Sequence, residues 1–349
     1  MLALPDLDQL RHQLAIPTIN TGRQIHLFGH RAGPVTDDIE RLHAIRDEQG
    51  RIRLMSGVEF SMQMYRGQTR EYSHCTPTLA RLNKTEDRLL ALCRRVAFED
   101  AIGEHPMVRL AEQVKLLDSP LYVDREGLAQ HYGLATDMLD VTSNFDVACF
   151  FATCAWDKSQ RRYLPVPSNE DAGVMYRITP ALMMGIGPSD EAFGPVHIVG
   201  WQPLPRPEQQ RAYVVKMKPE QDFSSLPTVE TFYFRHQEHI SHRLWEAFDG
   251  GEALFPWDAA AELADRAETM TGFTTDQIER AWERLSQWTL ESYDADKRKS
   301  VENTAGICFV DAPGLTWDGI GVEMSEESTR EAFHEVLNRV RFRLAAYGS

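Results

Sequence analysis

The chain has 349 residues, with 37 Lys and Arg against 52 Asp and Glu, so its formal net charge is −15. Its 42% hydrophobic and 26% charged residues are typical of a globular protein and exclude wholesale disorder and fibrous repeats. The acidic balance disfavours a broad grip on nucleic acid through many phosphate contacts, although a local basic groove stays open. The length favours two domains, or one domain with helical additions.

The first half of the chain predicts a mixture of helices and strands. A short helix opens the chain, and the pair Asp37-Asp38 is a suitable cap for a helix over 37–48. Apolar residues recur at helical spacing from Leu89 to Ile102. The predicted strands are 24–30, 59–66 and 138–142. A helix-rich stretch is predicted over 84–117 and continues in 124–132, and a buried helix is predicted over 145–156.

The second half becomes mostly helical after Pro227. Strands are predicted at 174–178, 196–201 and 212–217, where alternation in the last suggests a sheet edge or a half-buried strand. The stretch 163–171 is expected to be an exposed loop. Trp282 and Trp288 form a core stripe at helical spacing. Helices are predicted at 229–248, 257–270, 274–298 and 325–346. The pattern indicates an α+β body up to about residue 270, followed by a helical part.

The start of the chain lacks a basic segment followed by an apolar stretch, so we expect no signal peptide. The longest apolar segment, 147–156, is half of the roughly 20 residues that a membrane-spanning helix needs. The 5 cysteines are odd in number and scattered, which favours a reducing compartment. We therefore expect a soluble, cytoplasmic protein that does not associate with membranes.

Three short segments carry side chains suited to a binding site. Tyr65-Arg66-Gly67-Gln68 ends a strand, where a guanidinium can project into a cleft and a glycine allows close approach. Residues 130–143 combine polar side chains with a strand that bears Asp140 and ends in Thr142-Ser143 before a buried helix. Residues 206–213 form a polar loop before another strand.

Each segment also has a purely structural interpretation. Arg66 is then a surface residue at a turn, Thr142 or Ser143 caps the following helix, and Asp140 is a buried carboxylate with its hydrogen bonds satisfied. For the middle segment, both interpretations can hold at once.

The order of these segments resembles the FRG domain family. Its (F/Y)RG motif is matched by Tyr65-Arg66-Gly67, and its third motif by Arg206, Gln210 and Tyr213, or by Gln209 one position earlier. The middle motif is matched by Gln130, His131, Gly133, Thr136, Leu139, Asp140 and Thr142. The resemblance covers about residues 55–265 and implies an FRG domain at 55–268, an extension at 1–54 packed on it, and a helical extension at 269–349.

The chain departs from the family in the middle motif. Asp137 and Met138 stand where the family usually has a basic residue and Leu, so a contact from that position is not carried over.

A weaker similarity to ADP-ribosyltransferases implies a fold and a chemistry. The fold is α+β, with a split β-sheet core, flanking helices and a mostly helical C-terminal extension. NAD would be the substrate, with Arg66 on its phosphates and Thr142 and Ser143 near ribose and nicotinamide. Cleavage of the nicotinamide–ribose bond needs negative charge near the ribose. The residue that corresponds to the Glu on the third strand of ADP-ribosyltransferases is Glu208, Gln209 or Gln210. If that residue is a Gln, Asp140 or Glu208 must supply the carboxylate.

The resemblance thus yields a candidate set of site residues and partners. The catalytic candidates are Arg66, Asp140, Thr142 and Gln210, and the NAD-binding candidates are Tyr65, Arg66, Gly67, Gln68, Gln130, His131, Tyr132, Thr142, Ser143 and Arg206. The modified target would be a nucleic acid or a protein. The family also implies a bacterial toxin or phage-defence effector with a neutralising partner.

Two other classes of function compete. One is a non-catalytic module that binds a nucleotide or nucleic acid, favoured by the lack of an assured Glu in the third motif. The other is a metal-dependent hydrolase, suggested by His236, His239 and His242 with Glu238 and Glu246 on one predicted helix. Successive steps of three residues drift around a helix, so the imidazoles converge poorly. We therefore expect a solvated helix face there and no metal.

Overall fold

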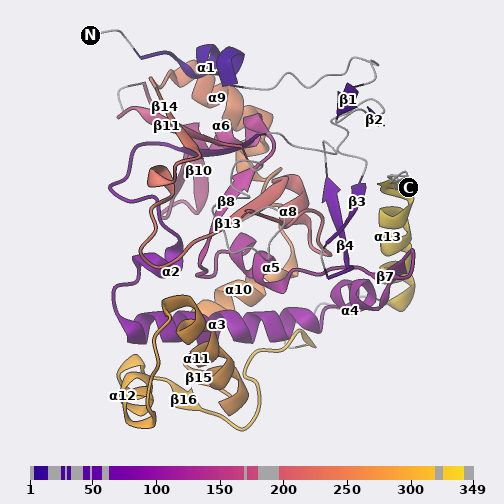
Figure 1. Ribbon diagram of the computed structural model, residues 1–349, viewed down its shortest axis with the longest axis vertical. Coiled ribbons are helices and arrows are strands. Elements are labelled where there is room, and N and C mark those ends of the chain that lie inside the picture. Colours follow the sequence, from indigo (N-terminus) through magenta and orange to yellow (C-terminus); the bar gives the residue numbers. More distant parts are fainter. Residues whose placement is uncertain are drawn as a thin grey trace.

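The computed structural model in Figure 1 describes residues 4–14, 25–27, 30–32, 42–47, 49–56, 63–168, 171–179, 196–318 and 325–341. Helices and antiparallel strands alternate along the chain, which confirms the predicted α+β class. Whether the sheet has the architecture of ADP-ribosyltransferases stays a prediction.

The central sheet has six strands, and every neighbouring pair in it is antiparallel. In spatial order they are β12 (Val196–Ile198), β13 (Ala212–Lys216), β8 (Met138–Thr142), β5 (Met64–Gln68), β11 (Gly173–Ile178) and β14 (Val229–Phe234). The junction in the middle is short, because β5 and β8 pair at a single position, Tyr65 with Thr142. The other pairs run along the strands, so the sheet consists of two three-stranded halves that meet at this point.

One face of the β5 half is covered by α6 (Phe145–Thr153), with α1 (Leu7–Leu14) and α9 (Glu238–Ala247) in the same hydrophobic cluster. The α6 sequence is apolar almost all round, as a helix buried on most sides requires. Its N-terminus is closed by Asn144, whose side chain accepts from the backbone of Asp146 (2.8 Å) and Val147 (3.3 Å).

The long helix α3 (Thr85–Gly103) separates the sheet from α11 (Thr275–Thr289) and α12 (Ala295–Ala305) (Figure 1). Its apolar face packs against both helices, and the shared cluster includes Trp282. Trp282 is 2% exposed, which confirms the prediction of a core stripe. Helices α11 and α12 therefore share a hydrophobic core with α3.

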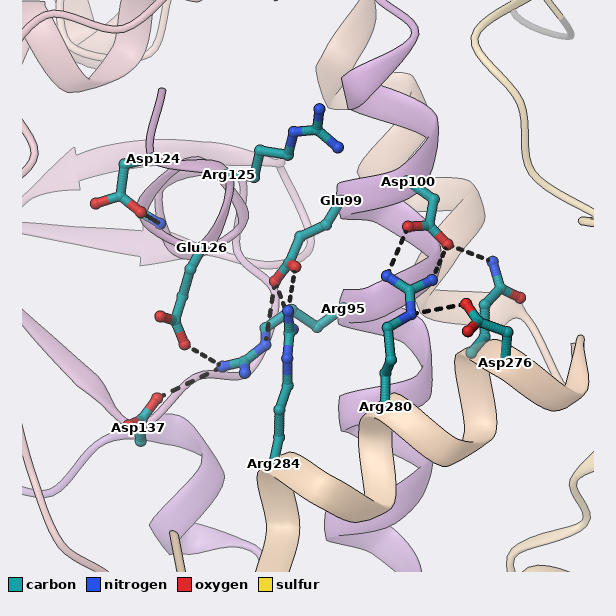
Figure 2. Close-up of polar contacts among 12 residues, drawn as sticks. Arg95, Glu99, Asp100, Asp124, Arg125, Glu126, Asp137, Asp276, Arg280 and Arg284 are labelled. Atoms are coloured by element: carbon teal, nitrogen blue, oxygen red, sulfur yellow. Dashed lines mark hydrogen bonds and ion pairs between the residues drawn. The ribbon is translucent and has the colours of Figure 1, made fainter. Parts of the chain in front are cut away.

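A network of buried charges crosses the same boundary (Figure 2). Arg95 on α3 is 3% exposed and forms ion pairs with Glu99, Glu126 and Asp137 at 3.4, 3.1 and 3.5 Å. The carboxylate of Glu99 also accepts hydrogen bonds from both terminal nitrogens of Arg284 on α11, at 2.8 and 2.6 Å. This network ties α3 to α11, to α5 and to the residue before β8.

The remaining elements surround this body. A second sheet has the order β17-β3-β4, and α13 packs on α4 beside it. The bounds are β1 (Ile25–Leu27), β2 (His30–Ala32), β3 (Leu42–Arg46), β4 (Ile52–Ser56), α2 (Thr78–Arg81), α4 (Pro106–Gln113), β6 (Lys115–Leu116), β7 (Ser119–Pro120), α5 (Arg125–His131), β9 (Cys154–Asp157), β10 (Arg162–Pro165), α8 (Pro205–Gln209), η1 (Phe223–Ser225), η2 (Asp249–Gly251), α10 (Ala259–Thr269), β15 (Gly272–Phe273), β16 (Cys308–Phe309), α13 (Glu326–Arg339) and β17 (Val340–Arg341).

Two segments that were predicted as helices form strands in whole or in part. The predicted helix 37–48 is wrong where it is described, because β3 pairs in register with β4 across a turn; residues 37–41 lie outside the described residues. The first part of the predicted helix 229–248 is β14, whose Val, Thr, Phe and Tyr residues suit a strand paired with β11. Tertiary pairing overrides the local helical pattern in both places.

Other predicted boundaries shift for local reasons. The stretch predicted to be rich in helices over 84–117 contains α3 and α4, which are separated at His105, the cap of α4 ahead of Pro106, and it ends in β6. The helix predicted over 145–156 ends at Thr153, and β9 follows. The predicted helix 274–298 breaks at Leu290, which has a φ of 57°. The helix predicted over 325–346 ends at Arg339.

Two predictions of exposure also change. The stretch predicted as a loop over 163–171 begins with part of β10, which pairs with β9. The strand 212–217, predicted at a sheet edge or half-buried, is neither: it lies between β12 and β8, and its residues from Ala212 to Val215 are buried. Of the predicted strand 24–30, Ile25–Leu27 is β1 and residues 28–29 lie outside the description.

Candidate functional site

A pocket of about 1070 Å³ opens where the two halves of the central sheet meet. Its lining comes from β5, β8, α6 and β9, together with segments around α2 and η1. The predicted site residues among its lining are Tyr65, Arg66, Gly67, Gln68, His131, Asp140, Thr142 and Gln210. Four others, Gln130, Tyr132, Ser143 and Arg206, do not line it.

Arg66 spans the gap between β5 and β8. Its Nη1 donates to the backbone carbonyl of Asp140 at 2.7 Å, and its buried Nε has no hydrogen-bond partner in the described part of the chain. A second cation, Arg81, lines the same pocket, and burial together with the charge of Arg66 lowers its pKa. Two guanidinium groups therefore share one pocket, an arrangement that attracts an anionic ligand.

The neighbours of Arg66 in its motif build the wall of the pocket. Tyr65 is buried, donates through its hydroxyl to the carbonyl of Leu14 at 2.8 Å, and meets Phe145 edge-on. Gly67 lies directly under α6, where an added Cβ would be 1.9 Å from the carbonyl oxygen of Ala148. The glycine is therefore required because a helix backbone passes against the strand.

Asp140 projects from β8 into the pocket. Its Oδ2 accepts from Gln130 Nε2 at 2.9 Å, and Thr136 donates to the Oε1 of the same amide, which fixes the amide orientation. The other oxygen, Oδ1, is buried and has no hydrogen-bond partner within the described residues. Gln130 thus acts from behind the pocket by holding the carboxylate, and the predicted fully satisfied Asp140 is only half satisfied.

Gln210 connects the third motif to the middle one. Its Oε1 lies 2.9 Å from His131 Nδ1, its Nε2 donates to the carbonyl of Leu254 at 2.9 Å, and its backbone carbonyl accepts from Thr142 Oγ1 at 2.7 Å. Both ends of the amide are engaged with the protein. Gln210 therefore positions His131 and β8, and its side chain has no polar end left for a ligand.

The hydroxyls that end β8 have different environments. Thr142 Oγ1 also accepts a hydrogen bond from the backbone N–H of Asn144 at 3.0 Å, so it supports the turn into α6. The N-cap of α6 is Asn144, whereas the sequence predicted Thr142 or Ser143 as the cap. Ser143 Oγ is buried without a hydrogen-bond partner in the described structure and lies outside the pocket lining.

The candidates outside the pocket have structural partners. The Tyr132 hydroxyl donates to Asp258, and burial with this neighbouring carboxylate raises the pKa of Tyr132. The guanidinium of Arg206 lies 4.4 Å from the centre of the Tyr132 ring. Glu208 is buried in an ion pair with Arg339 of α13. Among the three residues predicted for the third position, Gln210 lines the pocket, whereas Glu208 and Gln209 do not.

Several pocket residues were missed by the sequence prediction. They are the cations Arg81 and Lys158, the imidazole of His74, and the aromatic residues Tyr72, Phe151, Trp156 and Tyr163. Trp156 is 51% exposed and packs edge-on against Tyr163, with ring centres 5.1 Å apart. Apart from the run of aromatic residues around β9, no motif or spacing marks these positions, because folding alone brings them together.

The family departure at Asp137 and Met138 has a structural counterpart. Asp137 points away from the pocket toward Arg95 of α3 (Figure 2), and Met138 is buried in a small cluster with Val199 and Val214. These two side chains therefore attach the start of β8 to α3 and to the neighbouring strand β13.

Residues 61–161 match the family model of the FRG domain. The chain contains an FRG domain. The match includes the first two motifs and ends before the third, so the family role of residues 206–213 stays a prediction. No curated protein and no solved structure matches the chain. The pocket is therefore lined mainly by residues inside the FRG match, which include the first two motifs, and Gln210 joins them from outside it.

The predicted three-histidine helix does not form. His236 precedes α9, is buried, and contacts the carbonyl of Thr69 through Nε2 at 2.8 Å, whereas His239 and His242 are exposed on the helix. Within the described ranges, no group of three or more His, Cys, Asp or Glu side chains could hold a metal ion. No helix in that part of the chain combines the length and apolar character needed to cross a membrane.

Proposed function

We propose that the FRG pocket binds NAD or a related nucleotide, and that the chain uses NAD as an ADP-ribosyltransferase-like protein to modify a macromolecule. The observation that carries this proposal is a concentration of unsatisfied polar atoms. Four pocket residues, Arg66, Gln68, His131 and Asp140, each have a buried side-chain nitrogen or oxygen without a hydrogen-bond partner in the described structure. Native proteins pair most such atoms, so a cluster of them is typical of a site that binds a polar ligand.

The cations and aromatic rings of the pocket match the two parts of a nucleotide. Arg66 and Arg81 supply charge-assisted donors for a diphosphate. Phe151, Trp156 and Tyr163 offer ring faces and edges for a base or for nicotinamide. The pocket is at the upper end of the roughly 300–1,000 Å³ usual for small-molecule sites, which suits an extended ligand.

Asp140 is the pocket carboxylate that best suits the chemistry. Loss of nicotinamide gives the ribose oxocarbenium-like character, which a fixed negative charge stabilises. Gln210 is neutral and both its ends are engaged, and Glu208 is paired with Arg339 outside the pocket. The Oδ1 atom of Asp140 has no competing hydrogen bond in the described chain.

Binding is tested by calorimetry with NAD on the wild type, on Arg66→Lys and on Arg177→Lys. The first variant keeps the charge but loses the bidentate fork, and we expect NAD binding about tenfold weaker or worse. Arg177 lies on β11 and pairs with the exposed Glu230, so its variant is the matched control and should bind like wild type. Absence of NAD binding by the wild type would refute the proposal.

Turnover is tested by incubating the protein with labelled NAD and DNA, RNA or lysate. Asp140→Asn keeps the shape of the side chain and its contact with Gln130, and should retain NAD binding while nicotinamide release falls. The labelled macromolecule identifies the target class.

The second candidate is a non-catalytic nucleotide-binding module. The observation that favours it is Gln210, which provides no carboxylate at the third position and is fully engaged with His131 and Leu254. NAD binding with no nicotinamide release and no labelled product would select this function.

A further inference from the structure

His131 is the last residue of α5 and lines the FRG pocket, and it is 6% exposed. Its protonation pattern follows from its partner. Gln210 Nε2 donates to the carbonyl of Leu254, so the opposite end of that amide, facing His131 Nδ1 at 2.9 Å, is the oxygen. An amide oxygen only accepts, and therefore Nδ1 carries a hydrogen.

In the neutral ring, the hydrogen on Nδ1 leaves Nε2 as a lone pair. Nε2 is buried, and it has no hydrogen-bond partner among the described residues. It lies 3.8 Å from Asp140 Oδ1, too far for a hydrogen bond, and that oxygen also has no partner in the described chain. A proton acceptor and a carboxylate thus stand side by side in the pocket.

The environment also suits the charged form of the ring. If Nε2 takes a proton, the imidazolium has Asp140 beside it and still donates from Nδ1 to Gln210. The amide of Gln210 is held by Leu254, so the ring does not need to turn. A histidine held in one orientation by a second residue, with its other nitrogen facing a pocket, is the usual arrangement of a general base.

On the basis of the proposed function, we infer that His131 Nε2 is the general base for the acceptor and that the acceptor is a hydroxyl group. In the transfer, the bond between the ribose carbon and nicotinamide breaks, and its electron pair leaves with nicotinamide. The hydroxyl oxygen forms the new bond to that carbon, and its proton passes to Nε2. Asp140 stabilises both the positive ribose and the imidazolium, which later loses its proton to water.

A hydroxyl acceptor explains why the site needs a base in addition to a carboxylate. A hydroxyl is a poor nucleophile until its proton is removed, whereas an already ionised acceptor would need no such group. Gln210 cannot remove a proton, because its side chain is an amide with both ends engaged. In this pocket His131 is the one side chain that combines a lone-pair nitrogen with contact to Asp140.

The test uses two substitutions that separate the two ring nitrogens. In His131→Asn, the new side-chain amide can donate to Gln210 from the place of Nδ1, but nothing replaces Nε2. In His131→Gln, the longer amide reaches the place of Nε2 without supplying a base. We expect NAD binding within about twofold of wild type in His131→Asn, and transfer reduced about 100-fold or more in both variants.

Each result decides between the base and a structural role. Transfer near the wild-type rate in His131→Asn would overturn the base while leaving NAD use intact, and loss of NAD binding in that variant would assign His131 to ligand binding instead. A wild type that binds NAD and never transfers it would end both the base and the transferase function. Attachment of ADP-ribose to a group other than a hydroxyl would overturn the acceptor class.

A second measurement does not depend on turnover. Long-range ¹⁵N–¹H NMR spectra of the histidine side chains, assigned with His131→Asn, report which ring nitrogen carries the hydrogen. We expect the Nδ1–H form of His131 at neutral pH. The Nε2–H form would contradict the inference even if the protein were active.

Discussion

Substitution of Arg95 by methionine tests whether the charge network holds α11 to the FRG core. Arg95 and Arg284 pair with Glu99, Glu126 and Asp137 (Figure 2), and Lys216 also pairs with Glu126, so three cations balance three carboxylates. The unbranched methionine side chain replaces the aliphatic part of the arginine side chain but carries no charge. It leaves Glu99 buried with one cation and Asp137 without an ion-pair partner in the described chain.

The expected cost follows from the burial of the network. Arg95 is 3% exposed, and removal of one partner from a buried ion pair costs about 3–5 kcal/mol. Arg280→Met is the matched control on the same α3–α11 boundary. Its side chain is 35% exposed and pairs with Asp100 and Asp276, so its loss should cost about 1 kcal/mol.

Urea unfolding at pH 7 measures both free energies. The same measurement in 1 M NaCl gives a second comparison. Salt screens exposed ion pairs more than buried ones, so it should reduce the destabilisation by Arg280→Met much more than that by Arg95→Met. Burial and the nearby Glu126 raise the pKa of Asp137, so Asp137→Asn in the Arg95→Met background should restore part of the lost stability. Equal costs for the two arginines, or no recovery in the double variant, would refute this account of the network.

Two further predictions concern the FRG motif and the pH dependence of stability. Gly67→Ala should lower the free energy of unfolding by about 3 kcal/mol or more, because its Cβ would be 1.9 Å from the Ala148 carbonyl. Gly133→Ala, at a φ of +90° with no atom within 4 Å, should cost about 1–2 kcal/mol, and urea midpoints in the reverse order would contradict this. Burial lowers the pKa of His105 from 6.5 to about 4, so on acidification the unfolded chain takes up the proton first and stability falls from about pH 6.5 downward. At pH 5 the wild type should have lost about 2 kcal/mol of stability relative to neutral pH. His105→Asn keeps a side-chain acceptor for the Met107 N–H and should not show this loss. If the stability of the two proteins fell equally between pH 7 and pH 5, His105 would not be the cause.

The sequence predicts the middle of the fold better than its outer parts. The strand Met138–Thr142 and the helices after it and before it were placed correctly, since a run of apolar residues bounded by Gly133 and Asn144 leaves few alternatives. The strand Leu42–Arg46 was missed because Asp37-Asp38 suggested a helix cap; β4 follows it across a turn, and its other partner, β17, comes from the far end of the chain. Local patterns carry no information about such pairing.

The candidate site was predicted in composition but not in the roles of its members. Motif order correctly suggested that Arg66, His131, Asp140 and Gln210 lie together. It could not reveal that Gln210 is bound at both ends, because Leu254 is 44 residues away in the chain. Nor could it find Arg81 or Trp156, which reach the pocket from segments without a motif.

The motif residues divide according to which of their atoms the fold already uses. Gly67 admits α6, Gln130 holds Asp140, and Gln210 orients His131, so their identities follow from packing and hydrogen bonding. Arg66 and Asp140 keep buried polar atoms that no described residue satisfies. Burial of such atoms lowers stability unless a ligand offsets it. These residues therefore have two roles: Gly67, Gln130 and Gln210 build a rigid frame, whereas Arg66 and Asp140 keep buried polar atoms that a bound ligand would satisfy.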